Sequence, residues 1–218
     1  MPKLHINQNQ FSDLLNLTHK VFYPLKKFIN KSQFLSIINK MEYEKKFFPF
    51  PIFFGINREK YHEIKNFNTL DLIYKDKKIA TIDRIIFFSI NKKKFGKKIY
   101  GKKYHTHPFF KKFDKENYKF SSFRILKVFK TKYEDERFVK PSKVLKKIKK
   151  LRFAAFHTRN VPHLAHQWIH KYLFNKYDGL LIQPMIGQYK SGEYKDSTIL
   201  KLNQLVKGEY NNKNVLVL

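Results

Sequence analysis

Residues 153–166 read Phe-Ala-Ala-Phe-His-Thr-Arg-Asn-Val-Pro-His-Leu-Ala-His, and this stretch decides how the second part of the chain folds. Its first four residues are apolar, and those that follow are mostly polar or basic up to Pro162. An amphipathic segment runs from residue 167 to residue 177. This order is typical of a buried strand, a loop and a helix. Because ligands of open α/β sheets bind at the carboxyl ends of the strands, we expect the functional chemistry in this loop.

The segments after this stretch continue the same alternation. We expect strands at residues 153–156, 179–186 and 215–218, helices at 163–177 and 197–207, and a loop at 187–196. A β-α-β-α-β order is half of a doubly wound nucleotide-binding fold. The sequence therefore predicts a partial α/β, Rossmann-like domain.

The first part of the chain has a different pattern. Residues 1–45 are expected to form two helices, capped by Ser12 and Ser32 and separated by a break at Pro24. Strands are expected at residues 52–54, 69–74, 78–90 and 123–130, with a turn at Asp76-Lys77 and a loop at 95–113. An antiparallel sheet or small barrel is the simplest arrangement of these strands. A short helix at 143–150, capped by Ser142, is expected to link the two parts.

Composition narrows the class of protein. The chain has 218 residues, 42% of them hydrophobic and none of them cysteine, which excludes disulfides, thiolate zinc sites and a cysteine nucleophile. No signal peptide is visible, and the most apolar run, residues 47–56, is too short to span a bilayer. These features predict a cytoplasmic protein without a membrane partner.

The net charge of +29 has two explanations. Only six of the 46 basic residues are arginine, and lysine, asparagine, isoleucine and phenylalanine are all abundant, as codon bias in an AT-rich genome would produce. A dedicated nucleic-acid surface usually uses arginine for bidentate contacts. The alternative is a positive field that attracts an anionic partner.

The loop after residue 156 combines three features that suit a phosphate. Pro162 places His163 at the start of a helix, where free N–H groups and the helix dipole favour an anion. His166 lies three residues further, on the same helix face. Arg159 and Asn160 precede them, and the planar guanidinium fork of arginine suits a tetrahedral oxyanion. Taken singly, the histidines are also compatible with a surface pair and Arg159 with a structural ion pair.

The run from Phe156 to His166 resembles the nucleotide-binding motif of the ATP sulfurylase (sulfate adenylyltransferase) family, in which Gln-x-Arg-Asn precedes His-x-x-His. Further segments are similar to family motifs in the same order along the chain: Tyr23-Pro24-Leu25 with Phe28, residues 48–52, Tyr100-Gly101 with His107-Pro108, residues 178–187 and residues 190–193. The resemblance implies a PUA-like α+β domain with a barrel-like sheet at 1–141, a linker helix at 142–151, and half of a nucleotidyltransferase domain at 152–218.

The activity that this resemblance implies is the conversion of ATP and sulfate to adenosine 5′-phosphosulfate and pyrophosphate. It implies ATP with Mg²⁺ as the nucleotide, no metal bound by protein ligands, and no specific nucleic-acid partner. The implied catalytic residues are Thr158, Arg159 and Asn160. Sulfate would contact His157 and Arg159, and ATP would contact His157, Arg159, Asn160, His163 and His166.

Two departures from the family pattern qualify this expectation. His157 stands where the family motif has glutamine. The family's later Gly-Arg-Asp-His motif would fall beyond Leu218. These departures leave the activity of the chain alone open: it could be a truncated or split product that is inactive alone, with a homo-oligomer or a second polypeptide supplying the missing half of the catalytic domain.

Three other interpretations stay open from the sequence. The chain could be a nucleotidyltransferase with another acceptor, or a non-catalytic RNA-binding protein built on the PUA-like domain and the lysines. The third is a metal site formed by His157, His163 and His166.

Overall fold

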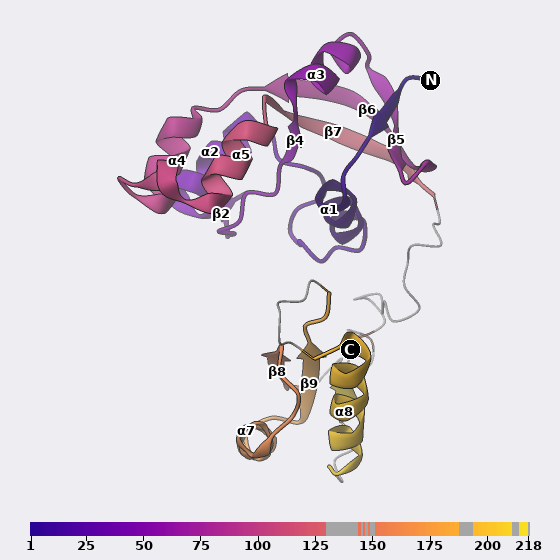
Figure 1. The fold of residues 1–218 in the computed structure, drawn as a ribbon, viewed down its shortest axis with the longest axis vertical. Coiled ribbons are helices and arrows are strands. Elements are labelled where there is room, and N and C mark those ends of the chain that lie inside the picture. The colour runs from indigo at the N-terminus through magenta and orange to yellow at the C-terminus, as the bar shows by residue number, and fades with distance from the viewer. Residues whose placement is uncertain are drawn as a thin grey trace. The chain divides into compact units, whose positions relative to one another are not determined.

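The computed structural model describes residues 1–129, 144, 146, 148, 151–187, 194–210 and 214–217. The chain divides into two compact units, Met1–Tyr133 and Glu134–Leu218 (Figure 1). None of the helices in the described ranges has the length and hydropathy that crossing a membrane requires.

The first unit is a mixed α+β structure around a five-stranded sheet. Its helices are α1 (Gln8–Thr18), α2 (Lys31–Lys40), α3 (Arg58–Ile64), α4 (Lys92–Tyr100) and α5 (Pro108–Glu116), with the 3-10 turn η1 (Tyr104–Thr106). Its strands are β1 (Lys3–His5), β2 (Glu42–Tyr43), β3 (Lys46–Phe47), β4 (Phe54–Ile56), β5 (Thr69–Tyr74), β6 (Lys77–Phe88) and β7 (Lys119–Val128). The sheet order is β1-β5-β6-β7-β4, and β2 pairs with β3 separately.

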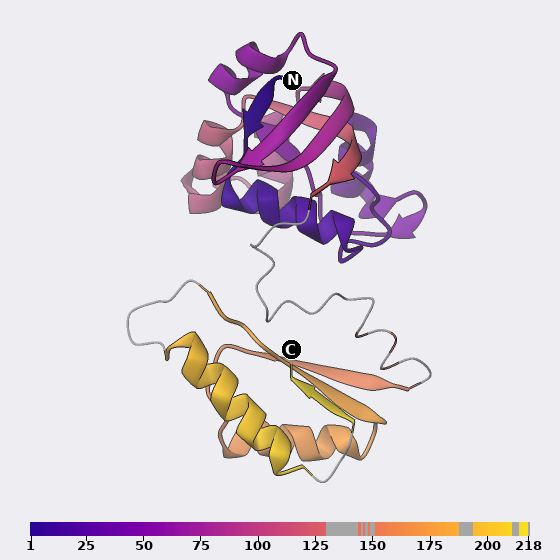
Figure 2. The ribbon, with the colours of Figure 1, turned by 90° about the vertical axis from the view of Figure 1, so that its right-hand side faces the viewer.

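The sheet is antiparallel except at β1, which runs parallel to β5. The long strands β6 and β7 curve strongly in Figure 2, and their pairing register shifts between Asp83 and Ile86, next to Arg84 at φ 50°. Such bulges increase local twist and bend the strand. The structure confirms the predicted antiparallel sheet, whose curvature is that of an open barrel.

Two predicted helix caps were wrong. Asn7, not Ser12, caps α1, and Asn30, not Ser32, caps α2. Each asparagine side chain accepts the backbone N–H three residues on, at 2.9 and 3.0 Å, and each helix has a glutamine there that returns the bond. These reciprocal capping boxes satisfy helix-end N–H groups, while both serines lie inside the helices.

The predicted loop at residues 95–113 was also wrong, because it contains most of α4 and α5. Pro108 is in the first turn of α5, where proline is tolerated, and Gly101, at φ 74°, ends α4. Gly96 lies within α4, and a Cβ there would be 2.4 Å from Tyr104 Cδ2 and 2.6 Å from Phe110 Cε2. These residues mark helix ends and a close helix contact, not irregular chain.

An aromatic core explains why α4 and α5 form. Phe95 of α4 lies 5.6 Å from Phe34 of α2 and 5.0 Å from Phe113 of α5, measured between ring centroids. The ring centroids of Phe113 and of Phe120 in β7 are 5.7 Å apart. Burying large aromatic side chains is strongly favourable, so these contacts stabilise helices that local signals alone did not predict.

Most strand bounds moved by a few residues. The β5–β6 turn is formed by Lys75 and Asp76, both at positive φ, and Lys77 begins β6. The strand predicted at 123–130 is β7 and begins at Lys119, and the one predicted at 52–54 is β4 and begins at Phe54. Strands β1, β2 and β3 and helix α3 were not predicted.

The second unit is the predicted β-α-β-α-β succession. Its elements are β8 (Phe153–Thr158), α7 (Leu164–Phe174), β9 (Gly179–Pro184), α8 (Asp196–Gly208) and β10 (Val215–Val217). The three strands are parallel in the order β10-β9-β8, and Figure 2 shows both helices on the same side of the sheet. Among its described residues, Ala154, Leu180, Ile182 and Val215 form a buried cluster, and Ile199 of α8 is also buried. Of the helix predicted at 143–150, the structure describes only residues 144, 146 and 148, which are helical, and Ser142 lies outside it.

Candidate functional site

The loop after β8 is fixed to the sheet at Thr158. Thr158 is buried and pairs with Pro184 of β9, and its carbonyl oxygen accepts the N–H of Met185 at 2.7 Å. Its hydroxyl oxygen accepts the backbone N–H of Asn160 at 3.0 Å. Arg159 and Asn160, both exposed, are therefore held at the carboxyl end of the first parallel strand.

Helix α7 begins immediately beyond this loop. His163 is its N-cap residue, at φ −146° and ψ 174°, and its carbonyl oxygen accepts the N–H of Gln167 at 3.1 Å. No side chain caps the helix, and its first turn contains no acidic residue. An uncapped helix N-terminus presents N–H groups and the positive end of the helix dipole, and these favour an anion.

Three histidines follow one side of α7, and the inner two, His166 and His170, contact Phe156 of β8. The rings of His163 and His166 are 3.9 Å apart, and those of His166 and His170 are 6.4 Å apart. Phe156 meets His166 edge to face at 5.0 Å and His170 at 4.5 Å. His163 is exposed, whereas His166 and His170 are buried. The column therefore runs from the helix end into the core.

Burial keeps the two inner histidines neutral. Desolvation, with a smaller repulsion from His163, lowers the pKa of His166 below its ordinary value. The pKa of His170 falls to about 4, again mainly through burial and secondly through His166. A bound anion would oppose the lowering at the outer end of the column, because a negative charge favours the protonated imidazole.

At the inner end of the column, His170 contacts Tyr210, a residue that follows α8. The Nδ1 atom of His170 and the hydroxyl of Tyr210 are 2.7 Å apart, and Tyr210 also packs on Phe174 at 5.1 Å. The buried Nε2 atom of His170 has no hydrogen-bond partner among the described residues. Among the described residues, Tyr210 is therefore the one hydrogen-bond partner of this imidazole, and it connects the column to the segment before β10.

Tyr210→Phe is expected to destabilise the second unit by about 1–3 kcal/mol, because it leaves both nitrogens of a buried imidazole unpaired. Urea unfolding followed by the fluorescence of Trp168, the only tryptophan, measures this change. Tyr177→Phe, at a position 40% exposed, is the matched control. Equal midpoints for the two variants would contradict the structural role of the hydroxyl.

The structure brings some of the predicted site residues together and separates one. Thr158, Arg159 and Asn160 form the strand end and loop, and His163 and His166 stack at the start of α7. His157 is exposed and adjacent to Phe156, so strand alternation directs it to the opposite face of the sheet. Residues 190–193 lie outside the described part of the chain.

Sequence reasoning missed His170 and Tyr210. The spacing His166-x-x-x-His170 places both on one helix face and was visible in the sequence. Tyr210 gave no signal, because its partner is 40 residues away. The described residues contain no group of three or more side chains placed to bind a metal ion, and the opposed directions of His157 and His163 explain why these histidines do not form one.

Comparisons with known proteins agree with this architecture of two units. A family model described as a PUA-like domain matches residues 1–121, and one described as ATP-sulfurylase matches residues 135–218. The first unit is thus a PUA-like domain, followed by a domain of the ATP-sulfurylase type. The chain thus combines a PUA-like domain with a region that is similar to ATP sulfurylases.

Several archaeal relatives are similar along the whole chain. Proteins named sulfate adenylyltransferase are 29% identical in Pyrococcus abyssi and 27% identical in Staphylothermus marinus, and each match covers 100% of this chain. The chain spans 58% of the length of these relatives. A solved hexameric APS kinase from Thiobacillus denitrificans has a similar fold, with a TM-score of 0.64 at 12% identity, over 100% of this chain and 41% of that one.

Proposed function

We propose that this chain carries the phosphate-binding part of a Rossmann-like nucleotidyltransferase that converts ATP and sulfate to adenosine 5′-phosphosulfate and pyrophosphate. The observation that carries the proposal is the uncapped N-terminus of α7, with His163 and His166 stacked beside it at the carboxyl end of β8. The names of the archaeal relatives supply the reaction. The same proposal divides the sequence into a PUA-like domain at 1–141, a linker at 142–151 and half of a nucleotidyltransferase domain at 152–218.

In this reaction a sulfate oxygen attacks the α-phosphorus of ATP in line, and pyrophosphate leaves. No protein side chain needs to become covalently attached, so catalysis consists of positioning and charge stabilisation. Arg159 would bind sulfate and the charge that develops at the α-phosphate. The side-chain amide of Asn160, next to Arg159, would donate a hydrogen bond to the same anion. Thr158 would hold the loop by accepting the hydrogen bond from the Asn160 backbone N–H.

The histidines would bind the phosphates that leave as pyrophosphate. His163 is exposed at the helix end and can donate a hydrogen bond directly. His166 is buried behind His163, so its ring would contact a bound phosphate from the inner side of the site. Mg²⁺ bound to ATP would neutralise phosphate charge, as it usually does with few protein ligands. His157, on the other face of the sheet, would need a loop rearrangement to reach the same sulfate.

A direct assay of the purified chain tests the proposal. ATP, Mg²⁺ and sulfate are supplied with pyrophosphatase, and sulfate-dependent phosphate release is compared with ATP binding by calorimetry. We expect His163→Gln to weaken ATP binding about tenfold, the value of one charge-assisted hydrogen bond. His105→Gln, which removes an exposed histidine of the first unit, is the control and should bind ATP like the wild type.

The two readouts separate the parts of the proposal. ATP binding without sulfate-dependent turnover would support the phosphate site and assign the completing residues to an oligomeric or second-chain partner. ATP affinity unchanged in His163→Gln would overturn the site itself. Turnover with another oxyanion but not with sulfate would overturn the substrate assignment.

A further inference from the structure

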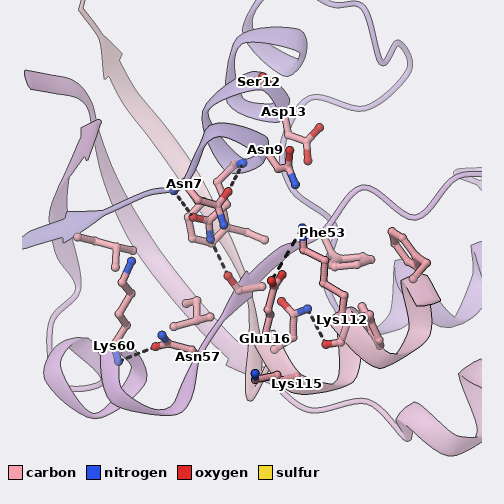
Figure 3. A pocket seen from close by; sticks show the side chains of 18 residues that line it. Asn7, Asn9, Ser12, Asp13, Phe53, Asn57, Lys60, Lys112, Lys115 and Glu116 are labelled. Carbon is pink, nitrogen blue, oxygen red and sulfur yellow. Dashed lines mark hydrogen bonds and ion pairs between the residues drawn. The ribbon is translucent and has the colours of Figure 1, made fainter. Parts of the chain in front are cut away.

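The first unit contains a pocket that the proposed function does not use. It has a volume of about 740 Å³ and lies between α1, β4 and α5. Small-molecule sites usually have volumes of roughly 300–1,000 Å³, so this one is large enough for a nucleotide. Figure 3 shows its walls, with α1 on one side and α5 on the other.

Several polar side chains around the pocket already serve the fold. Asn7 caps α1, Asn57 caps α3, and the Gln10 amide donates to the Gly55 carbonyl at 2.7 Å. The Asn117 amide donates to the Phe113 carbonyl at 2.9 Å. These four side chains are therefore not the groups that would recognise a ligand.

Asn9 and Asp13 differ from these structural amides. They lie four residues apart on α1, and Figure 3 shows their polar ends side by side at the pocket. Neither has a hydrogen bond or an ion pair with any residue in the described ranges. Burial alone raises the pKa of Asp13 to about 6. A half-buried carboxyl without a cationic neighbour costs stability, although the whole chain has a net charge of +29.

The opposite wall provides aromatic surface and positive charge. Phe109 of α5 is 54% exposed, and Phe53 lies between Asp13 and Lys112 in Figure 3. Among the described residues, the ion-pair partner of Lys112 is Glu116; this pair is long, at 3.9 Å, and exposed, and such pairs contribute little to stability. Lys115 lines the same wall and is exposed. The pocket thus has acceptors at one side, aromatic rings near its centre and cations at the other side.

We infer that this pocket binds a guanine nucleotide, with the base edge at Asn9 and Asp13 and the phosphate at Lys112 and Lys115. The guanine edge presents an acceptor, O6, next to two donors, the N1–H and the 2-amino group. A carboxylate accepts from both donors at once, and the Asn9 amide can donate to O6. Aromatic side chains and Watson–Crick hydrogen bonds are the usual means of recognising an unpaired base.

Calorimetry on the full chain at 0.15 M salt tests this inference with three probes. GMP is expected to bind, IMP, which lacks the 2-amino donor, about tenfold more weakly, and AMP, which presents the opposite edge, not measurably. Asp13→Asn should weaken GMP binding at least tenfold. The control Asp76→Asn, which removes an exposed carboxyl from the β5–β6 turn, should leave it unchanged.

Two further arms make the result decisive. Arg159→Ala should bind GMP like the wild type, since that residue belongs to the other unit, so failure of this inference and failure of the proposed function are distinguishable. A guanine-containing RNA trinucleotide that binds more tightly than GMP would make RNA the natural source of the base, and weaker binding would make it the free nucleotide. Equal affinities for GMP and AMP, or an unchanged affinity in Asp13→Asn, would overturn the inference.

Loss of GMP binding in Asp13→Asn would not be explained by unfolding, because the substitution is not expected to destabilise the fold. Because the folded-state pKa of Asp13, about 6, exceeds the ordinary pKa of an aspartate, 3.8, the folded state binds more protons than the unfolded state between these values. The free energy of unfolding therefore falls as pH rises through that window. The charged groups lining the same pocket are Lys60, Lys112, Lys115 and Glu116. Asp13→Asn should raise the melting temperature at pH 7.5 but not at pH 4, while losing GMP.

Discussion

Leu180→Ala is expected to remove most of the stability of the second unit. Leu180 is fully buried, and the buried apolar residues in the described part of this unit are few: Ala154, Leu180, Ile182, Ile199 and Val215. Replacing a buried leucine by alanine costs about 2–5 kcal/mol, and whole domains are stable by only about 5–15 kcal/mol. A core this small has few neighbours that can close the cavity, so we expect the upper part of that range.

Trp168 makes this loss measurable in the intact chain. It is the only tryptophan, and it lies on α7, so its fluorescence reports on the second unit during urea unfolding. Leu205→Ala, which removes a leucine of α8 that is 58% exposed, is the matched control and should shift the free energy by about 0.5 kcal/mol or less. A midpoint for Leu180→Ala equal to that of the control would contradict the assigned core.

Arg159→Ala is expected to lower kcat/KM for the sulfate-dependent reaction by about 10²–10³, the usual effect of removing one preorganised charge-stabilising group. The proposed role depends on a charge that develops in the transition state, so kcat should fall more than the affinity for ATP. Arg159→Lys should recover only part of the loss, since an ammonium group lacks the planar fork that binds two oxygens.

Arg152→Ala is the appropriate control for this experiment. Arg152 directly precedes β8, at the opposite end of the strand, where it lies 3.6 Å from Asp178 and is 73% exposed. The substitution removes the same charge from the same unit without touching the proposed site. If both variants lose activity equally, the effect of Arg159 is only its contribution to the overall positive field.

The second unit was predictable because its local signals agree with its packing. Short apolar runs with turn residues between them mark β8 and β9, and the register Ala154–Leu180 follows from burying their alternate side chains on α7 and α8. The loop at Thr158 and the paired histidines were placed correctly at the strand end and helix start. What the sequence could not show was the depth of His166, which depends on Phe156 and His170 packing behind it.

The first unit was less predictable because tertiary contacts override its local signals. Gly96, Gly101 and Pro108 are normally signs of a loop. The segment is nevertheless helical, and the contacts of Phe95 with Phe34 and of Phe113 with Phe95 and Phe120 stabilise it. The serine caps were wrong for a different reason. Asparagine at Asn7 and Asn30 is matched by a glutamine three residues on, and this reciprocal pair outweighs a single nearby hydroxyl.

The hydrogen bond between His170 and Tyr210 has a consequence for the order of folding. It joins positions 40 residues apart, and the parallel pairs of β8 with β9 and β9 with β10 also connect distant segments. Contacts between distant segments slow folding, because the intervening chain must be ordered first. On a ribosome, the PUA-like unit would emerge and fold early. The histidine column would acquire its rigid inner end only after Tyr210 has left the exit tunnel.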